Sequence, residues 1–237
     1  MILDKYKYLL FDLDDTLLDF QDNERNSLEF IFKKYNIPFD EKSINQYKSI
    51  NRKFWSQIEQ GCIKKEEALT KRFEEFFALY GYNIEGEIIE NEYQNCLTKG
   101  HKTIPKAMET LIELRNRGYK IFVGTNGIGQ TQKQRLKDSK LMNLFDDVFI
   151  SEEMGVEKPN SKFFEMIFNK YDFMKKDETL MIGDSLASDI KGANNFGIDC
   201  VWFNILNKEC KDIKATYEIH DLSELLLMLN REANAAV

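Results

Sequence analysis

The sequence predicts an α/β protein with a Rossmann-like core, built on a doubly wound parallel sheet, and an inserted all-helical cap domain. Five short apolar runs lack in-and-out alternation, which is typical of parallel strands covered on both faces. Helical patterns separate the later runs, as expected for right-handed βαβ units. Residues 20–99 have helical periodicity and no strand pattern, and this stretch is far longer than one crossover helix requires.

The expected elements of the core follow in chain order. The predicted strands are Tyr8–Phe11, Lys120–Val123, Asp147–Ile150, Thr179–Ile182 and Cys200–Phe203. The predicted helices are Pro105–Arg117, Gln130–Ser139, Lys162–Tyr171 and Ser188–Phe196. The first of these helices has proline near its start and Gly118 just past its end, which is the usual punctuation of a helix.

The inserted stretch follows the first strand directly and carries apolar residues at helical spacing, so we expect a separate helical domain. The predicted division is a discontinuous catalytic core of residues 1–19 and 100–237 and a cap of residues 20–99. Tyr47, Phe54 and Trp55 of the cap could stack on a nucleobase. At helical spacing, however, aromatic residues usually belong to a core, and that interpretation is favoured.

Composition argues against several classes of function. The 237 residues carry a net charge of −7 without a stripe of basic residues, so no nucleic-acid polymer is an expected partner. The apolar runs are much shorter than the roughly 20 residues that span a bilayer, and the N-terminus does not resemble a secretory leader. The four cysteines form no metal or redox motif. We therefore expect a cytoplasmic protein with reduced cysteines used for packing, acting on a small molecule, with no membrane or protein partner implied.

Residues with chemically active side chains follow four of the predicted strands. They lie in the strings FDLDDTL, VGTNG, VEKPN and MIGDSLASD. The residues are Asp12, Asp14, Thr125, Asn126, Lys158, Asp184 and Asp189. In an open α/β sheet the carboxyl ends of the strands meet at one edge and line the ligand site, so these side chains are expected to lie together.

Four carboxylates packed together would repel one another unless a cation lay among them. Mg²⁺ prefers oxygen ligands, usually a few carboxylates together with water and substrate phosphate. A Mg²⁺ ion held by Asp12 and Asp184 would bind a phosphoryl oxygen, and Lys158 would supply a second positive charge. Phosphoryl transfer depends mainly on positioning and on neutralising charge, so the residues indicate a phosphoryl-transfer enzyme.

The order of these motifs resembles a known family. DxDxT, a strand-terminal threonine, a lysine and GDxxxxD are the four-motif signature of the haloacid dehalogenase-like hydrolases, and the resemblance covers almost all of the chain outside the cap. It implies that Asp12 is the nucleophile, which forms an aspartyl-phosphate. It also implies that Asp14 is the general acid towards the leaving alkoxide and then the base towards water.

The same resemblance implies the binding roles. Thr125 and Lys158 would hold the phosphoryl oxygens. Beside the resemblance, the turn after the strand would direct the backbone amides of Asn126 and Gly127 at an anion. The side chain of Asp12, the backbone carbonyl of Asp14 and the side chain of Asp184 would bind Mg²⁺. Asp189 would support the metal site through water or through Lys158.

A narrower resemblance concerns the substrate. TNGIGQTQKQRLKDSKL and GDSLASDIKGANNFGID are similar to the YjjG/YfnB-type group of pyrimidine 5′-nucleotidases. The presence of Asp14 and Thr16 matches the phosphatases of the family rather than its dehalogenases or mutases. The resemblance therefore implies a 5′-nucleotidase that acts on pyrimidine nucleoside monophosphates such as dUMP, UMP and dTMP.

Other interpretations remain open at this point. The same chemistry could serve phosphosugars or phosphoglycolate. The fold could also survive as a catalytically silent binding module, although such a module would not need both Asp12 and Asp14. Taken singly, Asp residues at strand ends could cap helices, Asp189 could be a first-turn residue favoured by the helix dipole, and residues 125–127 could form an ordinary turn. All four motifs occurring in order favour the enzyme.

Overall fold

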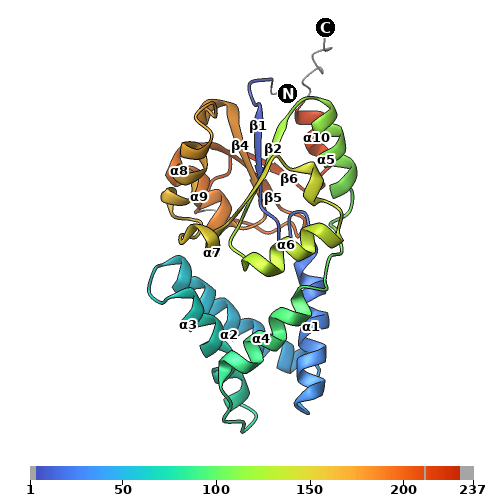
Figure 1. Ribbon diagram of the computed structural model, residues 1–237, viewed down its shortest axis with the longest axis vertical. Coiled ribbons are helices and arrows are strands. Elements are labelled where there is room, and N and C mark those ends of the chain that lie inside the picture. Colours follow the sequence, from blue (N-terminus) through green and yellow to red (C-terminus); the bar gives the residue numbers. More distant parts are fainter. Residues whose placement is uncertain (1–3, 211, 230–237) are drawn as a thin grey trace. The chain divides into compact units, whose positions relative to one another are not determined.

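A six-stranded parallel sheet is the centre of the computed structural model, which describes residues 4–210 and 212–229 (Figure 1). The strand order is β3-β2-β1-β4-β5-β6, and every neighbouring pair is parallel. The strands are β1 Tyr8–Phe11, β2 Lys120–Thr125, β3 Asp147–Ile150, β4 Thr179–Gly183, β5 Asp199–Phe203 and β6 Tyr217–Ile219. The predicted doubly wound α/β fold is therefore confirmed.

Strand β1 lies in the middle of the sheet, between β2 and β4. Its successive residues point to opposite faces. Leu9 and Phe11 belong to the apolar cluster on one face, and Leu10 belongs to the cluster on the other. Because both faces are buried, the strand is a continuous apolar run, and the chain can place charged groups only where the strand ends.

Helices cover both faces of the sheet, with α5 and α10 on one side and α8 and α9 on the other (Figure 1). The helices of this part of the chain are α5 Ala107–Asn116, α6 Gly129–Asp138, α7 Ser151–Met154, α8 Ser161–Lys170, α9 Lys191–Phe196 and α10 Glu224–Met228. Short 3₁₀ turns lie at Met142–Leu144 and Lys176–Glu178.

Several elements differ from the sequence prediction, since α7, α10 and β6 are not among the expected elements. The single helix expected over Ser188–Phe196 is a π-helical turn, Leu186–Ile190, that continues into α9. Strand β6 has only three residues, including the exposed Glu218, and so lacks the apolar run by which the other strands are recognised. It forms an edge of the sheet, where only one neighbour is needed.

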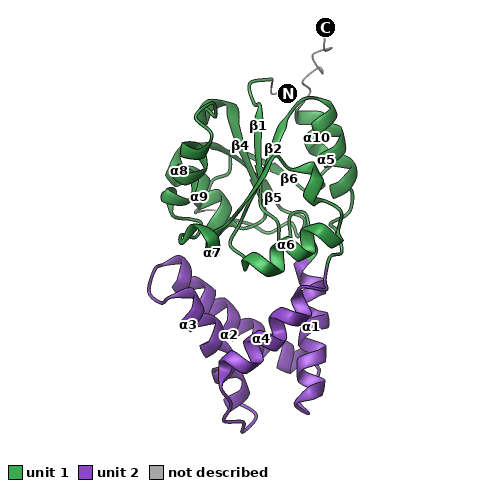
Figure 2. Cartoon of the chain, viewed as in Figure 1, with its two compact units in different colours: residues 1–19, 101–237 green, residues 20–100 purple. Residues whose placement is uncertain are grey.

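The described residues divide into two compact units (Figure 2). Unit 1 contains the residues up to Asp19 and those from His101 onward, and it holds the sheet. Unit 2 is Phe20–Gly100 and is entirely helical. Its helices are α1 Phe20–Lys34, α2 Glu41–Glu59, α3 Lys65–Ala78 and α4 Gly86–Leu97.

Unit 2 has an apolar core of its own, rich in aromatic residues. The rings of Phe32 and Phe76 stack with their centroids 4.8 Å apart. Tyr47 and Phe54 are buried in this core, which is the packing interpretation that their helical spacing favours, and Trp55 packs against it while partly exposed. These aromatic residues therefore stabilise the helical unit.

Two further observations concern the chain as a whole. The four cysteines are free, as expected, but only Cys200 is buried; Cys62 is exposed, so the expectation that all four serve packing is wrong for that residue. No helix among the described residues has the length and apolar character needed to cross a membrane.

Candidate active site

The first carboxylate of the site, Asp12, follows β1 directly. Its amide donates a hydrogen bond of 2.8 Å to the carbonyl of Ile182 in β4, so the residue still lies in register with the sheet. The chain then turns back, because the amide of Leu18 donates to the carbonyl of Leu13 at 2.9 Å. This tight turn contains Asp14 and keeps it near the end of the strand.

The buried side chain of Lys158 connects two of these carboxylates. Its Nζ donates to Asp12 Oδ1 at 2.7 Å, to Asp189 Oδ1 at 2.6 Å and to the carbonyl of Gly124 at 2.5 Å. These three contacts satisfy all three ammonium donors. Burial alone would lower the pKa of Lys158, but the two carboxylates raise it above its usual range, so the side chain stays charged.

The main chain of Lys158 is held by Asn126. The Asn126 side chain accepts a hydrogen bond of 2.9 Å from the Lys158 amide and donates one of 2.8 Å to the Lys158 carbonyl. This reciprocal pair ties the end of β2 to the loop that carries the lysine. The sequence points to the backbone amide of Asn126 as a phosphate ligand; the side chain has this second, structural task that the sequence did not indicate.

Asp12, Asp184 and Asp189 form an acidic cluster, in which each residue offers an oxygen within 4.8 Å of the others. Burial raises the pKa of Asp184 well above its usual value, and the neighbouring carboxylates raise it further. Burial also raises the pKa of Asp12, against the opposing effect of Lys158. One ammonium does not balance three carboxylates in such a site, and their oxygens are ligands of the kind that Mg²⁺ prefers.

Asp184 is oriented by its backbone. Its amide donates to the hydroxyl of Thr16 at 3.1 Å, and its carbonyl accepts a hydrogen bond of 2.9 Å from the indole of Trp202. Thr16 belongs to the first motif, so the hydroxyl joins the ends of β1 and β4. This contact gives Thr16 a physical role within the DxDxT pattern.

Asp189 lies in the π-helical turn after β4, but its carboxylate is fully buried rather than facing solvent. One oxygen contacts Lys158, and the other accepts a hydrogen bond of 3.0 Å from the amide of Ser185. Gly183 makes room for it, because a Cβ at that position would lie 2.3 Å from Asp189 Oδ2. The glycine of the GDxxxxD string is therefore required by close packing.

The carboxylate of Asp14 is not a member of the acidic cluster. It contacts Gln132 and Arg135, two side chains of α6 that the sequence did not indicate. Gln132 also donates to the hydroxyl of Thr125 at 2.9 Å, and that hydroxyl accepts a further hydrogen bond of 3.2 Å from the amide of Gly127. The structure thus brings the seven predicted residues into two groups. Asp12, Asp184 and Asp189 form the acidic cluster beside Lys158, whose main chain Asn126 holds. Asp14 and Thr125 form the second group, joined through Gln132.

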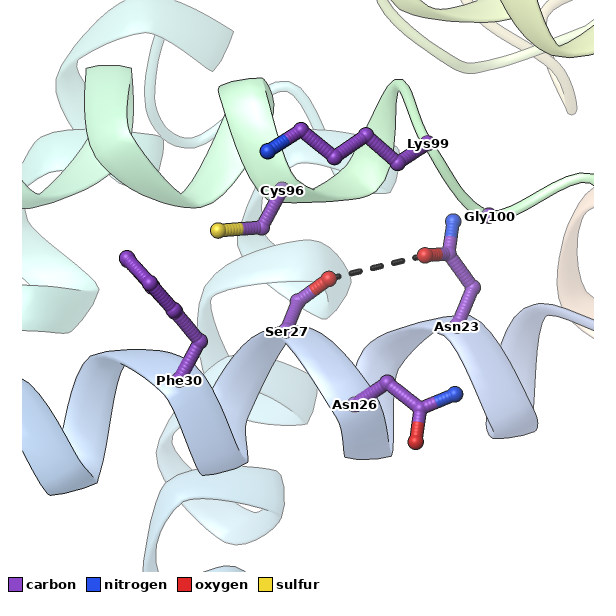
Figure 3. A pocket seen from close by; sticks show the side chains of 7 residues that line it. All are labelled: Asn23, Asn26, Ser27, Phe30, Cys96, Lys99 and Gly100. Carbon is purple, nitrogen blue, oxygen red and sulfur yellow. Dashed lines mark hydrogen bonds between the residues drawn. The ribbon is translucent and has the colours of Figure 1, made fainter.

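Unit 2 has a separate pocket of about 290 Å³ between α1 and α4 (Figure 3). Asn23, one of its lining residues, donates a hydrogen bond of 2.9 Å to the carbonyl of Leu97. The lining residues are Asn23, Asn26, Ser27, Phe30, Cys96, Lys99 and Gly100. None of the predicted site residues lines it.

Comparison with known proteins places the chain among hydrolases. The model of the haloacid dehalogenase-like hydrolase family matches residues 9–203. Pyrimidine 5′-nucleotidase PynA of Streptococcus pneumoniae is 37% identical over 227 residues, which cover 95% of this chain and 96% of PynA. Pyrimidine 5′-nucleotidase YjjG of Escherichia coli is 30% identical, with 95% of this chain and 98% of YjjG covered.

A solved structure gives the same result. HAD-hydrolase YfnB of Bacillus subtilis is 38% identical over 229 residues, which cover 96% of this chain and 97% of YfnB. Its orthorhombic crystal form, described as bound to magnesium and as revealing interdomain movement, matches with a TM-score of 0.90 and covers 95% of this chain and 99% of that one.

Proposed function

The chain belongs to the haloacid dehalogenase-like hydrolase family, and we propose that it is a Mg²⁺-dependent phosphomonoesterase with Asp12 as its nucleophile. One observation carries the proposal. The carboxylate of Asp12 is in contact with the buried ammonium of Lys158, and it lies in the same acidic cluster as Asp184. A carboxylate nucleophile between a fixed positive charge and a cation site is what phosphoryl transfer to an aspartate needs.

The reaction has two displacements. A carboxylate oxygen of Asp12 attacks phosphorus, the bond from phosphorus to the leaving oxygen breaks, and Asp14 gives its proton to that oxygen. Water then attacks the phosphorus of the aspartyl-phosphate and gives a proton to Asp14. The bond to Asp12 breaks, which releases inorganic phosphate and restores both carboxyl groups.

The remaining residues bind and orient the phosphoryl group. Thr125 and the backbone amide of Asn126 would hold its oxygens, and Lys158 would do so by exchanging one of its three present acceptors for a phosphoryl oxygen. Asp12, Asp184 and the main-chain carbonyl of Asp14 would hold Mg²⁺, which neutralises negative charge on the phosphoryl oxygens when bound. Asp189 keeps Lys158 in place, since its carboxylate is 2.6 Å from the ammonium.

The substrate class we propose is a pyrimidine nucleoside 5′-monophosphate, such as dUMP, UMP or dTMP. Two relatives similar over 95% of the chain, PynA and YjjG, are named pyrimidine 5′-nucleotidases, which supports this choice. The helical unit 2 is proposed to act as the cap that excludes water and selects the leaving group.

Phosphate release from a panel of compounds tests both levels of the proposal. The panel contains pyrimidine and purine nucleoside monophosphates, phosphosugars and phosphoglycolate, each with Mg²⁺ and with a chelator. We expect Mg²⁺-dependent release that favours the pyrimidine nucleotides. Release that favours phosphosugars would support the proposed mechanism but contradict the proposed substrate class. No release from any compound would contradict both and favour a catalytically silent binding module.

The nucleophile is tested by Asp12→Asn. We expect kcat/KM to fall at least ~10⁴-fold, because the amide cannot form the aspartyl-phosphate. Asp138→Asn, at an exposed position on α6, is the matched control and should leave the rate unchanged. If Asp12→Asn retained activity, the assignment of Asp12 as the nucleophile would be wrong.

A further inference from the structure

Both carboxylate oxygens of Asp14 are held by one helix. Gln132 Nε2 donates to Asp14 Oδ2 at 2.7 Å, and Arg135 Nη1 donates to Asp14 Oδ1. The two α6 side chains also contact each other, with Arg135 Nη1 donating to Gln132 Oε1 at 2.8 Å. Gln132 and Arg135, hereafter the α6 pair, therefore form a closed hydrogen-bonded arrangement with Asp14.

The α6 pair is buried on the inner face of the helix, together with Thr131 and Leu136. Gln132 and Arg135 are each 1% exposed, and Lys133 and Gln134 between them are exposed. Burying a guanidinium costs free energy unless a partner of opposite charge offsets it. Two inward-facing positions of the helix therefore carry polar side chains that contact Asp14. Apolar side chains at these positions would be buried without needing a polar partner.

The α6 pair also connects Asp14 to the proposed phosphoryl-binding group. The same Nε2 of Gln132 that contacts Asp14 donates to the hydroxyl of Thr125 at 2.9 Å. One amide group thus fixes the positions of two groups that must face neighbouring atoms of a phosphomonoester: Thr125 at a phosphoryl oxygen and Asp14 at the leaving oxygen.

We propose that Gln132 and Arg135 are positioning residues that hold Asp14 where it can protonate the leaving oxygen. This inference rests on the proposed phosphomonoesterase function. The pair does not touch the reacting atoms and acts through Asp14. Without the pair, the carboxyl group of Asp14 would rotate about its side-chain bonds and would less often be oriented to give its proton to the leaving oxygen.

The consequence depends on the leaving group. p-Nitrophenolate leaves without a proton, whereas the 5′-alkoxide of a nucleoside needs one as the bond to phosphorus breaks. The ratio kcat/KM reports the steps through formation of the aspartyl-phosphate, and so includes proton delivery to the leaving group but not the later hydrolysis. A positioning role therefore predicts a larger loss for a nucleotide than for p-nitrophenyl phosphate.

The test compares UMP with p-nitrophenyl phosphate in the full-length protein. For Gln132→Met we expect kcat/KM to fall on the order of 10-fold or more with UMP and by less than ~3-fold with p-nitrophenyl phosphate. Gln134→Ala, at an exposed position on the same helix, is the matched control and should change neither value. Arg135→Lys keeps the charge and should lose less than Arg135→Met with UMP.

A second comparison asks whether the effect passes through Asp14. In an Asp14→Asn background, Gln132→Met should lower kcat/KM for UMP no more than it lowers kcat/KM for p-nitrophenyl phosphate. Equal losses on both substrates, or the same preferential loss without the Asp14 carboxyl, would overturn the positioning role. If Arg135→Met does not fold, the neutral replacement at Gln132 still decides the question. Absence of phosphate release from the unsubstituted protein would instead refute the proposed function itself.

Discussion

Asp12 and Asp184 carry buried carboxyl groups whose pKa values are raised, chiefly by burial. Without a cation, the folded protein binds these protons more tightly than the unfolded chain does. The contribution of these two groups to the free energy of unfolding therefore falls as the pH rises above the ordinary aspartate pKa of 3.8 towards the raised values, and it does not recover above them. In the metal-free state, ionisation of the acidic cluster therefore lowers the free energy of unfolding.

Added Mg²⁺ should offset this loss, and its effect should grow with pH because its carboxylate ligands must be deprotonated. At a concentration about 100-fold above its Kd, Mg²⁺ should raise the thermal midpoint by roughly 5–10 °C near pH 8, and by clearly less near pH 5. Thermal melts at the two pH values, with Mg²⁺ and with a chelator, measure this.

Asp184→Asn should abolish most of the Mg²⁺ effect, because the amide is a poorer ligand, while Asp138→Asn on the exposed face of α6 should leave it intact. An equal rise in the midpoint at both pH values, or a rise that persists in Asp184→Asn, would contradict a magnesium site in the acidic cluster.

At the scale of elements, each of the four helices of unit 2 contributes one buried polar residue to a single network. Asn51 of α2 donates to Glu24 of α1 at 3.3 Å, and Arg72 of α3 donates to Asn51 at 2.7 Å. Arg72 also donates to Glu90 of α4 at 2.6 Å, where the two side chains are 4% and 9% exposed. These hydrogen bonds join all four helices and fit one relative register of them.

Arg72→Met should therefore destabilise unit 2 strongly, because it removes the positive charge that pairs with the buried Glu90. We expect a loss of ~3–5 kcal/mol in the free energy of unfolding. The two tryptophans lie in different units, so in a Trp202→Phe background the fluorescence of Trp55 reports the unfolding of unit 2 in urea.

Two variants complete this experiment. Arg52→Met, at an exposed position of α2, should change the stability by no more than about 0.5 kcal/mol. The double variant Arg72→Met with Glu90→Leu should recover much of the loss, since no buried charge then lacks a partner. A single variant Arg72→Met as stable as the Arg52→Met control would show that the network contributes nothing.

For the molecule as a whole, the sequence predicts the sheet and the place of the site. Continuous apolar runs such as Tyr8–Phe11 indicate buried parallel strands, and their polar successors must then meet at one edge. Asp12, Lys158 and Asp189 do meet there. This part of the site is predictable because it depends on strand ends, which are local features of the chain.

The remaining contacts join residues that are distant in sequence and have no strand end to mark them. Gln132 and Arg135 belong to a helix rich in polar residues, where they look like solvent-exposed positions. Arg72 and Glu90 look equally ordinary in unit 2. Only the folded structure shows which polar side chains of a helix face inward, because the apolar periodicity on which sequence interpretation depends does not include them.

The position of β1 has a consequence for synthesis of the chain. Leu9, Leu10 and Phe11 are synthesised before their strand partners in β2 and β4, which follow more than 100 residues later. At roughly 5–20 residues per second, this strand waits for several seconds with its edges unpaired, a state prone to aggregation. Residues Phe20–Gly100 form a contiguous unit with an apolar core of its own, so all of the residues that this core needs are synthesised before the central strand finds a neighbour.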